Sequence, residues 1–299
     1  MSIFKNILKK KKILVTNDGS FHADDLFATA TLSILNNGNI KIIRTRDPEI
    51  IEKGDYVYDV GGIYDEKLNR FDHHQEGGAG FRSNGVPYSS FGLVWKKFGE
   101  QICGSKEVAD KIEERLVQSI DVNDNGINLF EVKGEVVPYL IQDIFFNFRP
   151  SWKEEQDYDN SFIKLVPFVI EILKREIIQT KDRIEVESII REAYENAEDK
   201  RVIIFDGNYP WFETINEYSE PLYVISRKGD LWRAEAVRKE KYKFETRKPF
   251  PAEWAGKRDE EMAKISGVAD AIFCHNGRFL VVAKSKEGIM ELVKKALIA

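Results

Sequence analysis

The sequence predicts an α/β protein with two domains, the first of which is built on a parallel sheet. Short β-branched runs such as Lys12–Thr16 alternate with amphipathic segments at the start of the chain. Such strand–helix–strand alternation indicates parallel strands joined by crossover helices. A second block rich in strands begins near residue 201, after a long helical pattern. The length of 299 residues also suits two domains, because a domain usually contains roughly 100–200 residues.

The first domain is expected to cover residues 13–198 and to follow an N-terminal arm of residues 1–12. Its predicted strands are Lys12–Thr16, Ile40–Arg44 and Asp55–Val60, followed by a short strand that leads into Asp72. Its predicted helices are Leu26–Gly38, a short turn or helix after Asp47, Ser89–Phe98, Lys106–Ile120 and Pro138–Phe146. Residues 160–197 are expected to form two helices, or one that bends near Thr180.

The second domain is expected to cover residues 199–299, with the boundary in a charged stretch at residues 195–201. Its predicted strands are Arg201–Phe205, Leu222–Ser226, Leu231–Val237, Ala271–Cys274 and Phe279–Ala283, and residues 288–297 form a closing helix. Gly229-Asp230 and Asn276-Gly277 are typical of tight turns between antiparallel strands. The second sheet is therefore expected to contain hairpins.

The composition is ordinary for a soluble globular protein, with 42% hydrophobic and 32% charged residues. A formal net charge of −5 argues against a broadly basic protein that coats nucleic acid, although it is compatible with a local basic groove. The two cysteines, Cys103 and Cys274, are far apart, which argues against a disulfide framework or a thiolate zinc site. No run of about 18 apolar residues predicts a membrane span, and we expect a cytoplasmic protein.

The N-terminal arm combines a short apolar piece with the lysines of residues 9–12. A signal peptide has its basic residues first and then a longer apolar run, so this order predicts a surface arm instead. Contact with a membrane surface or with nucleic acid is the alternative interpretation of the lysines.

Three of the four histidines lie in the first quarter of the chain, and each adjoins acidic residues. His22 and Asp24 follow the first predicted strand, whereas His73 and His74 follow the short strand that leads into Asp72. In an open α/β sheet, ligands bind outside the carboxyl ends of the strands. We therefore expect these side chains to meet at one edge of the sheet.

Asp59 ends the third predicted strand and precedes a glycine pair, so it can project to the same edge. Imidazole and carboxylate ligands together suit Mn²⁺, Fe²⁺, Co²⁺ or Zn²⁺, and a site rich in carboxylates also holds Mg²⁺. Two such ions about 3.5–4 Å apart can clamp a phosphoryl group and activate water. We expect Asp59 to bridge the two ions.

Each motif also has a simpler structural interpretation. Asp24 and Asp25 can stabilise the start of the following helix through its dipole, and residues 72–74 can form an exposed polar turn. Asp121 lies near the carboxyl end of a predicted helix, shortly before an Asn-Gly pair, and can belong to an ordinary helix end. An acid is unfavourable at that end of a helix dipole, which favours a cation nearby.

Four motifs occur in an order that resembles a known family. They are the His22-x-Asp24 pair, the VxDVGG segment at 57–62, the FDHHQ segment at 71–75 and the IDxxDNG segment at 120–126. Together they are similar to the melanocyte-proliferating-gene exonuclease family, a branch of the DHH phosphoesterase superfamily. Further similarity in residues 147–152, 249–256 and 266–275 extends the resemblance from about residue 13 to the end of the chain.

The resemblance implies a DHH-type catalytic domain and a smaller α/β domain that resembles the DHH-associated substrate domain. The residues that match the family's metal ligands are His22, Asp24, Asp59, His73 and Asp121, and Asn17 stands where the family usually has a histidine. His74 matches the residue that approaches the substrate phosphate or leaving group, so His74 and Asp59 are the expected catalytic residues. Asp25 and Asp72 are expected to orient histidines or water. Asn17 is a poor ligand for zinc-like ions, so the expected cofactors are two divalent ions, Mn²⁺ or Mg²⁺.

In the second domain, Arg247, Arg258 and His275 are the expected substrate contacts, because arginine binds phosphate through paired hydrogen bonds. The expected function is a metal-dependent phosphodiester hydrolase, an exonuclease that acts on single-stranded RNA or short oligonucleotides by a two-metal mechanism. A homo-oligomer is compatible with this interpretation, and no membrane partner is expected. The alternatives are a binding or scaffold protein that has lost catalysis, as Asn17 would suggest, and a hydrolase of a small phosphoester such as a cyclic dinucleotide.

Overall fold

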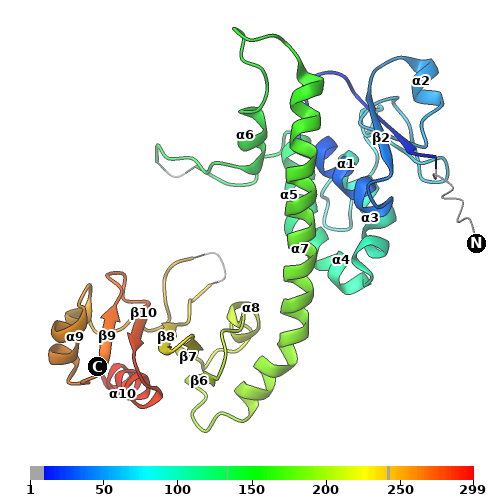
Figure 1. Cartoon of the computed structure of the whole chain (residues 1–299). Helices are drawn as coiled ribbons and strands as arrows, with labels where there is room; N and C mark the ends of the chain where they lie inside the picture. The colour runs from blue at the N-terminus through cyan, green and yellow to red at the C-terminus, as the bar shows by residue number, and fades with distance from the viewer. Residues whose placement is uncertain (1–9, 133, 241–242) are drawn as a thin grey trace, which may run out of the picture. The chain divides into compact units, whose positions relative to one another are not determined.

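The computed structural model describes residues 10–132, 134–240 and 243–299 (Figure 1). Two compact units divide the chain between Lys181 and Asp182, and each is described below by itself. Most of the expected N-terminal arm lies outside the described residues. Within the described part of the chain, no helix combines the length and the apolar character that a membrane crossing requires.

The sheet of the first unit contains five strands in the order β2-β1-β3-β5-β4. They are β1 (Lys12–Thr16), β2 (Ile40–Arg44), β3 (Tyr56–Tyr58), β4 (Tyr64–Asp65) and β5 (Arg70–Phe71). β1 pairs in parallel with β2 and β3, and β3 pairs in parallel with β5, whereas β4 is antiparallel to β5. The α/β fold with a parallel sheet, predicted from the alternation of strands and helices, is therefore confirmed.

Before α7 (Tyr158–Glu195), the first unit contains α1 (Ala23–Leu35), α2 (Pro48–Glu52), α3 (Ser90–Cys103), α4 (Lys106–Ile112), the π-helical turn η1 (Glu113–Val117), α5 (Gln118–Asp124) and α6 (Ile141–Phe146). Among them, α1 and α3 pack on the sheet and bury its apolar residues. Leu32 of α1 and Leu93 of α3 are fully buried in one cluster with Leu14, Tyr58 and Phe71 of the sheet. Each such side chain stabilises the packing by roughly 1.5–3 kcal/mol, which holds the two helices on the strands.

The loops that leave β1, β3 and β5 share one edge of the sheet because these strands are parallel. β1 leads into residues 17–22, β3 leads into Asp59, and β5 leads into residues 72–75. The topology therefore carries the histidine and aspartate motifs to a single rim.

The helical pattern of residues 160–197 forms one helix, α7 (Tyr158–Glu195), rather than two. Pro167 lies inside α7, where its missing N–H removes one intrahelical hydrogen bond. The last turns of α7 contribute Val186 and Ile190 to a core cluster of the second unit that also contains Ile203. The division between the compact units therefore falls within α7, whereas the sequence placed the domain boundary after residue 198.

The second unit contains a mixed sheet in the order β6-β7-β8-β10-β9. Its strands are β6 (Val202–Phe205), β7 (Tyr223–Lys228), β8 (Leu231–Ala236), β9 (Ala271–Cys274) and β10 (Leu280–Ala283). β7 with β8 and β9 with β10 form antiparallel hairpins, as their Gly-containing turns predicted. The helices are α8 (Phe212–Ile215), the 3-10 turn η2 (Ala252–Trp254), α9 (Asp259–Ser266) and α10 (Lys286–Ile298), of which the sequence predicted only α10.

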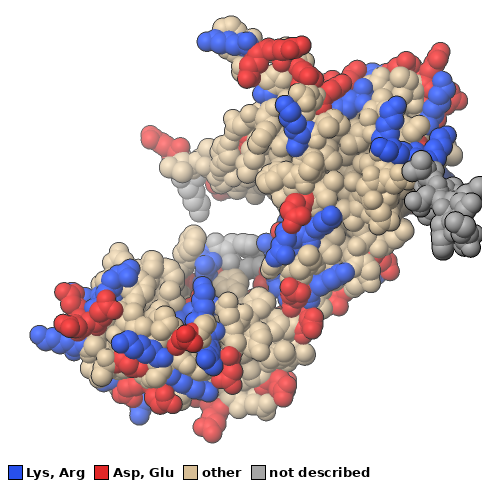
Figure 2. Space-filling model, in the orientation of Figure 1, with Lys and Arg blue, Asp and Glu red and all other residues tan. Residues whose placement is uncertain are grey.

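Acidic and basic side chains are interspersed over the visible face of each unit (Figure 2). Together with the net charge of −5, this mixture does not favour a protein that coats nucleic acid through charge alone. A charged ligand would then be recognised by a few side chains at its binding site, and not by the charge of the whole surface.

Candidate metal centre

Acidic and histidine side chains form two adjacent groups at the edge of the first sheet. One group contains Asp59, Asp72, His73 and His74, and the other contains His22, Asp24 and Asp124, with the ligand atoms of each group within 4.8 Å of one another. His73 joins the groups, because its Nε2 lies 3.0 Å from Asp124 Oδ2. The Nδ1 of His22 lies 3.8 Å from the other Asp124 oxygen. The two groups therefore form one continuous site.

Asp59 connects the histidines of the DHH run to the acids of the site. It follows β3 with a φ of 57°, a conformation that residues other than glycine seldom adopt and that recurs at functional sites. Its Oδ1 lies 3.9 Å from His73 Nδ1 and 3.6 Å from His74 Nδ1. Burial and the negative charge of Asp124 raise the pKa of Asp59 to about 7. The surrounding protein therefore favours the protonated form of Asp59 over the ionised form.

Asp24 gives the clearest indication that this site holds a cation. Its side chain lies in the first turn of α1 and is fully buried. Neither of its carboxylate oxygens accepts a hydrogen bond from an N–H or hydroxyl donor of the described residues, and the side chain that faces it is another acid, Asp124. Burial, together with the charges of Asp124 and Asp59, raises the pKa of Asp24 well above its usual range. A buried carboxylate is costly unless a cation neutralises it, and this mixture of imidazole and carboxylate fits a divalent metal ion.

Asp72 orients the two histidines of the DHH run. Its Oδ1 accepts hydrogen bonds from the backbone amides of His73 and His74, at 2.8 and 3.1 Å, and lies 2.8 Å from His74 Nδ1. Although burial opposes the shift, hydrogen bonds from His74 and Gly62 lower the pKa of Asp72 to about 2. The hydrogen bond to Asp72 also raises the pKa of His74. His74, with 62% of its side chain exposed, is thus held in one orientation at the surface of the site.

Asn17 and Asp25 support the groups that surround them. Asn17 is buried, donates its side-chain amide to Asp59, and accepts a 2.9 Å hydrogen bond from the backbone of Gly19. Asp25 accepts a 3.1 Å hydrogen bond from the backbone amide of His22. These contacts place Asn17 to orient Asp59, and Asp25 to hold the start of α1. The expected role of Asn17 as a metal ligand stays a prediction.

Asp121, the expected last acid ligand, lies outside both groups. Its carboxylate accepts hydrogen bonds from Arg82 at 2.6 Å, from Ser89 Oγ at 2.5 Å and from the backbone amide of Gly92 at 3.1 Å. These donors hold the carboxylate against α3, so it does not reach the histidines.

Asp124, one helical turn further along α5, lies near the histidines, and the expected role of Asp121 as a metal ligand stays a prediction. The two carboxylate oxygens of Asp124 lie near His22 and His73. Both acids belong to the same IDxxDNG segment, and the pattern of residue types does not separate them. The aspartate directly before the Asn-Gly turn is the signal that could have identified Asp124.

The three expected substrate residues of the second unit have partners within that unit. The guanidinium of Arg258 lies 4.4 Å from the centre of the Phe273 ring, and the His275 ring lies 6.2 Å from the same ring. Arg247 donates a 3.0 Å hydrogen bond to the carbonyl oxygen of Pro221, and burial lowers its pKa. The structure therefore brings Arg258 and His275 together around Phe273, and the contact of all three with a substrate stays a prediction.

Comparison with known proteins places this chain among relatives that share nearly its whole length. The MYG1_exonuc family model, described as uncharacterised protein family UPF0160, matches residues 13–297. A MYG1 protein of Chlamydia pneumoniae is 34% identical over 294 residues, which cover 94% of this chain and 95% of that protein. The protein of Homo sapiens that is named MYG1 exonuclease is 28% identical over 323 residues, covering 94% of this chain and 85% of that protein.

Among solved structures, RecJ from Thermus thermophilus in complex with Mn²⁺ matches with a TM-score of 0.30 and 12% identity. The match covers 97% of this chain but only 52% of RecJ, so the chain spans about half the length of that protein. The resemblance inferred from the four motifs is confirmed by the family model, and the chain belongs to the MYG1 exonuclease family.

Proposed function

We propose that this chain is a metal-dependent phosphodiester hydrolase that removes nucleotides from the ends of single-stranded RNA or short oligonucleotides. The observation that carries the proposal is the fully buried carboxylate of Asp24, which meets the acid Asp124 and accepts no hydrogen bond from an N–H or hydroxyl donor of the described residues. Asp59 and Asp124 lie close enough to raise its pKa further, so a bound cation explains why these acids converge. The nuclease activity is supported by family membership, since several relatives are named MYG1 exonuclease.

The division of the ligands into two groups supports a site for two ions. His22, Asp24 and Asp124 would hold one ion, and the group that contains His73 would hold the other. Asp59 is our candidate for the shared ligand, because its charge acts on Asp24 of the first group and its carboxylate lies near His73 of the second. When bound, Mn²⁺ or Mg²⁺ would neutralise charge on the phosphoryl oxygens and activate the attacking water.

His74 is suited to move a proton to the leaving oxygen. Its Nδ1 is held by Asp72 at 2.8 Å, which raises the pKa of His74 and leaves Nε2 as the atom available to a substrate. Because a general acid must be protonated at the working pH, this shift favours the role. Asp72, whose pKa is low, stays ionised and keeps the imidazole in a fixed orientation.

We further propose that the first unit is the catalytic domain and that the second unit is the substrate domain. Arg247, Arg258 and His275 would contact the phosphates of the nucleic acid through charged hydrogen bonds. Replacement of each by Ala is then expected to raise KM for an oligonucleotide more than it lowers kcat.

The test of the proposed function is hydrolysis of a 5′-labelled single-stranded RNA by metal-stripped protein resupplied with Mn²⁺ or Mg²⁺. The matched control is the Asp59→Ala variant, which is expected to keep its fold and to lose turnover. A metal-dependent ladder that is absent in the variant would support the proposal, and the pattern of shortening would report the direction of attack. Hydrolysis retained in Asp59→Ala would overturn the assignment of Asp59, and no cleavage with either metal would overturn the nuclease proposal.

A further inference from the structure

Residues 140–149, which include α6 and the turn after it, are fastened to the loop that carries His22. Gln142 Oε1 accepts a 2.6 Å hydrogen bond from the backbone amide that follows His22. The guanidinium of Arg149 donates to the carbonyl oxygen of the residue before His22. The Phe146 ring meets the His22 ring edge to face, with centres 5.9 Å apart. This segment therefore forms one wall of the metal centre.

Arg149 brings a cation with an unfilled hydrogen-bond donor to that wall. Its guanidinium lies 3.6 Å from the centre of the Phe146 ring. Its Nη2 makes the contact with the loop of His22 and its Nε is buried, whereas its Nη1 has no hydrogen-bond partner in the described part of the chain. A planar guanidinium whose donors are not all used is suited to bind an oxyanion such as phosphate.

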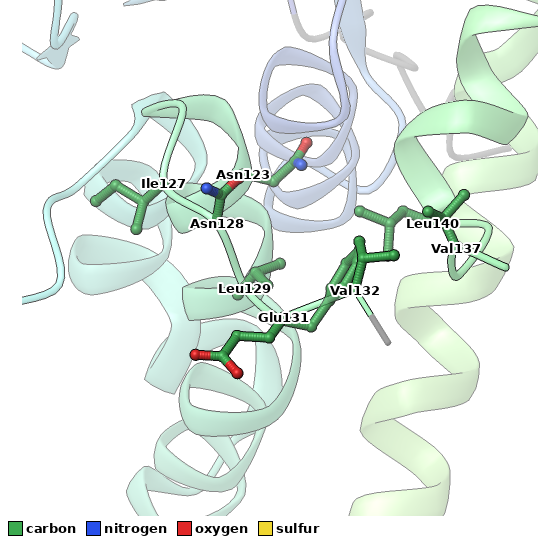
Figure 3. Close-up of a pocket in the computed structure, with 9 residues that line it drawn as sticks. Asn123, Ile127, Asn128, Leu129, Glu131, Val132, Val137 and Leu140 are labelled. Atoms are coloured by element: carbon green, nitrogen blue, oxygen red, sulfur yellow. The ribbon is translucent and has the colours of Figure 1, made fainter. Parts of the chain in front are cut away.

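A cavity of about 910 Å³ is enclosed by the end of α5, the segment that follows it and the start of α6 (Figure 3). It is lined by Asn123, residues 127–132, Val137 and Leu140, so it includes the neighbour of Asp124 and the residue that precedes α6. Its lining combines apolar side chains with the amides of Asn123 and Asn128 and the carboxylate of Glu131. A nucleobase requires this combination, since its faces are apolar and its edges form hydrogen bonds.

Three aromatic side chains near α6 are exposed rather than packed. Tyr139, Phe148 and Trp152 are 67%, 53% and 86% exposed, respectively. The Nζ of Lys153 lies 4.9 Å from the centre of the Trp152 ring, which adds a cation to this surface. Exposed aromatic rings with basic neighbours are typical of surfaces on which the bases of single strands stack.

We propose that Arg149, Phe146 and the adjoining cavity form a binding site for single-stranded nucleic acid. Arg149 binds the phosphate of a nucleotide next to the cleaved one, and the cavity receives a base. This inference rests on the proposed function and adds the residues that position the strand at the metal centre. Nucleic acid is favoured over a protein partner because the segment that borders the cavity also presents an arginine with an unfilled donor beside the metal ligands.

The test measures binding of a fluorescein-labelled single-stranded RNA with phosphorothioate linkages to the full chain in Mn²⁺, by anisotropy at several salt concentrations. Arg149→Gln is compared with Arg149→Lys and with Arg115→Gln, a control at an exposed arginine that pairs with Glu176. We expect Arg149→Gln to weaken binding roughly tenfold or more, because a charged hydrogen-bond pair is lost. The slope of log K against log salt should also become shallower by roughly 0.7, the effect of one phosphate contact on a single strand.

Arg149→Lys should keep the slope and recover part of the affinity, and Arg115→Gln should match the wild type. Unchanged RNA affinity in Arg149→Gln would overturn the inference. Weaker binding with an unchanged salt slope would also overturn it, because it would show that Arg149 only holds the loop of His22. A change of oligomeric state in Arg149→Gln, measured by light scattering and without loss of RNA affinity, would also overturn it and would indicate a contact between copies. Cleavage of unmodified RNA by the wild type separates this inference from the proposed function. If the wild type cleaves RNA and Arg149→Gln binds it with unchanged affinity, only this inference is overturned. If the wild type neither cleaves nor binds RNA, both proposals are overturned.

Discussion

His73 Nε2 lies 3.0 Å from Asp124 Oδ2, and this contact joins the DHH run after β5 to the last residue of α5. It links the two groups of ligands into one site. Asp121 lies one turn earlier on the same helix and is held by Arg82 instead. Two aspartates of one motif therefore have different partners: Asp124 meets a histidine, and Asp121 meets an arginine.

Replacement of Asp124 by Asn is expected to weaken metal binding, whereas replacement of Asp121 by Asn is expected to destabilise the fold. Asp124→Asn should keep the fold and weaken Mn²⁺ binding. Loss of a residue that only hydrogen-bonds to a metal ligand lowers affinity roughly 10–100-fold, and loss of a ligand should lower it by at least as much. Asp121→Asn should lower the free energy of unfolding by up to roughly 3–5 kcal/mol, because it breaks a buried ion pair with Arg82. Calorimetric titration with Mn²⁺ and denaturant unfolding measure the two effects. Equal loss of Mn²⁺ affinity in both variants would contradict the assignment of Asp124.

The contribution of Asp59 to the stability of the metal-free protein is expected to fall as the pH rises from about 4 to about 7. The pKa of Asp59 is raised from 3.8 to about 7 in the folded protein, so the folded state holds a proton that the unfolded state releases in this range. Stabilisation by Mn²⁺ should grow over the same range, since protons and the ion compete for the carboxylates. Thermal unfolding with and without Mn²⁺ measures both trends, and Asp59→Asn serves as the control with a weaker pH dependence. A stabilisation by Mn²⁺ that does not change with pH would contradict this account.

Replacement of Asn17 by His is expected to strengthen binding of one divalent ion. The Asn17 amide contacts Asp59, and an imidazole at this position can supply a nitrogen ligand that binds Mn²⁺ or Zn²⁺ better than an amide oxygen does. Mn²⁺ titration of the wild type and of Asn17→His, with Asn17→Ala as the control, measures the change. If Asn17→His bound Mn²⁺ no more tightly than the wild type, the position would not be a ligand site.

Replacement of Gly92 by Ala is expected to destabilise the fold. A Cβ atom at Gly92 would lie 1.8 Å from Asp121 Oδ2, so Asp121 and the Arg82 that binds it would have to move. Overpacking of this kind costs roughly 1–3 kcal/mol of unfolding free energy. Gln101→Ala, at an exposed position of α3, is the control and should change stability by less than roughly 0.5 kcal/mol. Denaturant unfolding that gave the same free energy for Gly92→Ala and the wild type would refute the steric argument.

The parallel sheet and the location of the site were predictable because they depend on local patterns. Alternation of β-branched strands and amphipathic helices indicated the sheet, and the acids and histidines fell directly after its strands. Since parallel strands end at one edge, His22, Asp59 and His73 were expected to meet there, and the structure brings them together. The continuity of α7 was less predictable, because Pro167 and the polar residues near Thr180 also permit an interruption.

The sequence by itself determined which residue types reach the edge of the first sheet, since strand ends and residue identity are local properties. Only the tertiary structure decided between Asp121 and Asp124. The two acids lie on successive turns of α5, about 4.5 Å apart along the helix axis, and no local pattern distinguishes them. Packing of α5 against α3 directs Asp121 toward Ser89 and Gly92, and leaves Asp124 facing the histidines. A shift of one helical turn, set by contacts between distant segments, therefore separates the acid that supports the fold from the acid that joins the proposed metal centre.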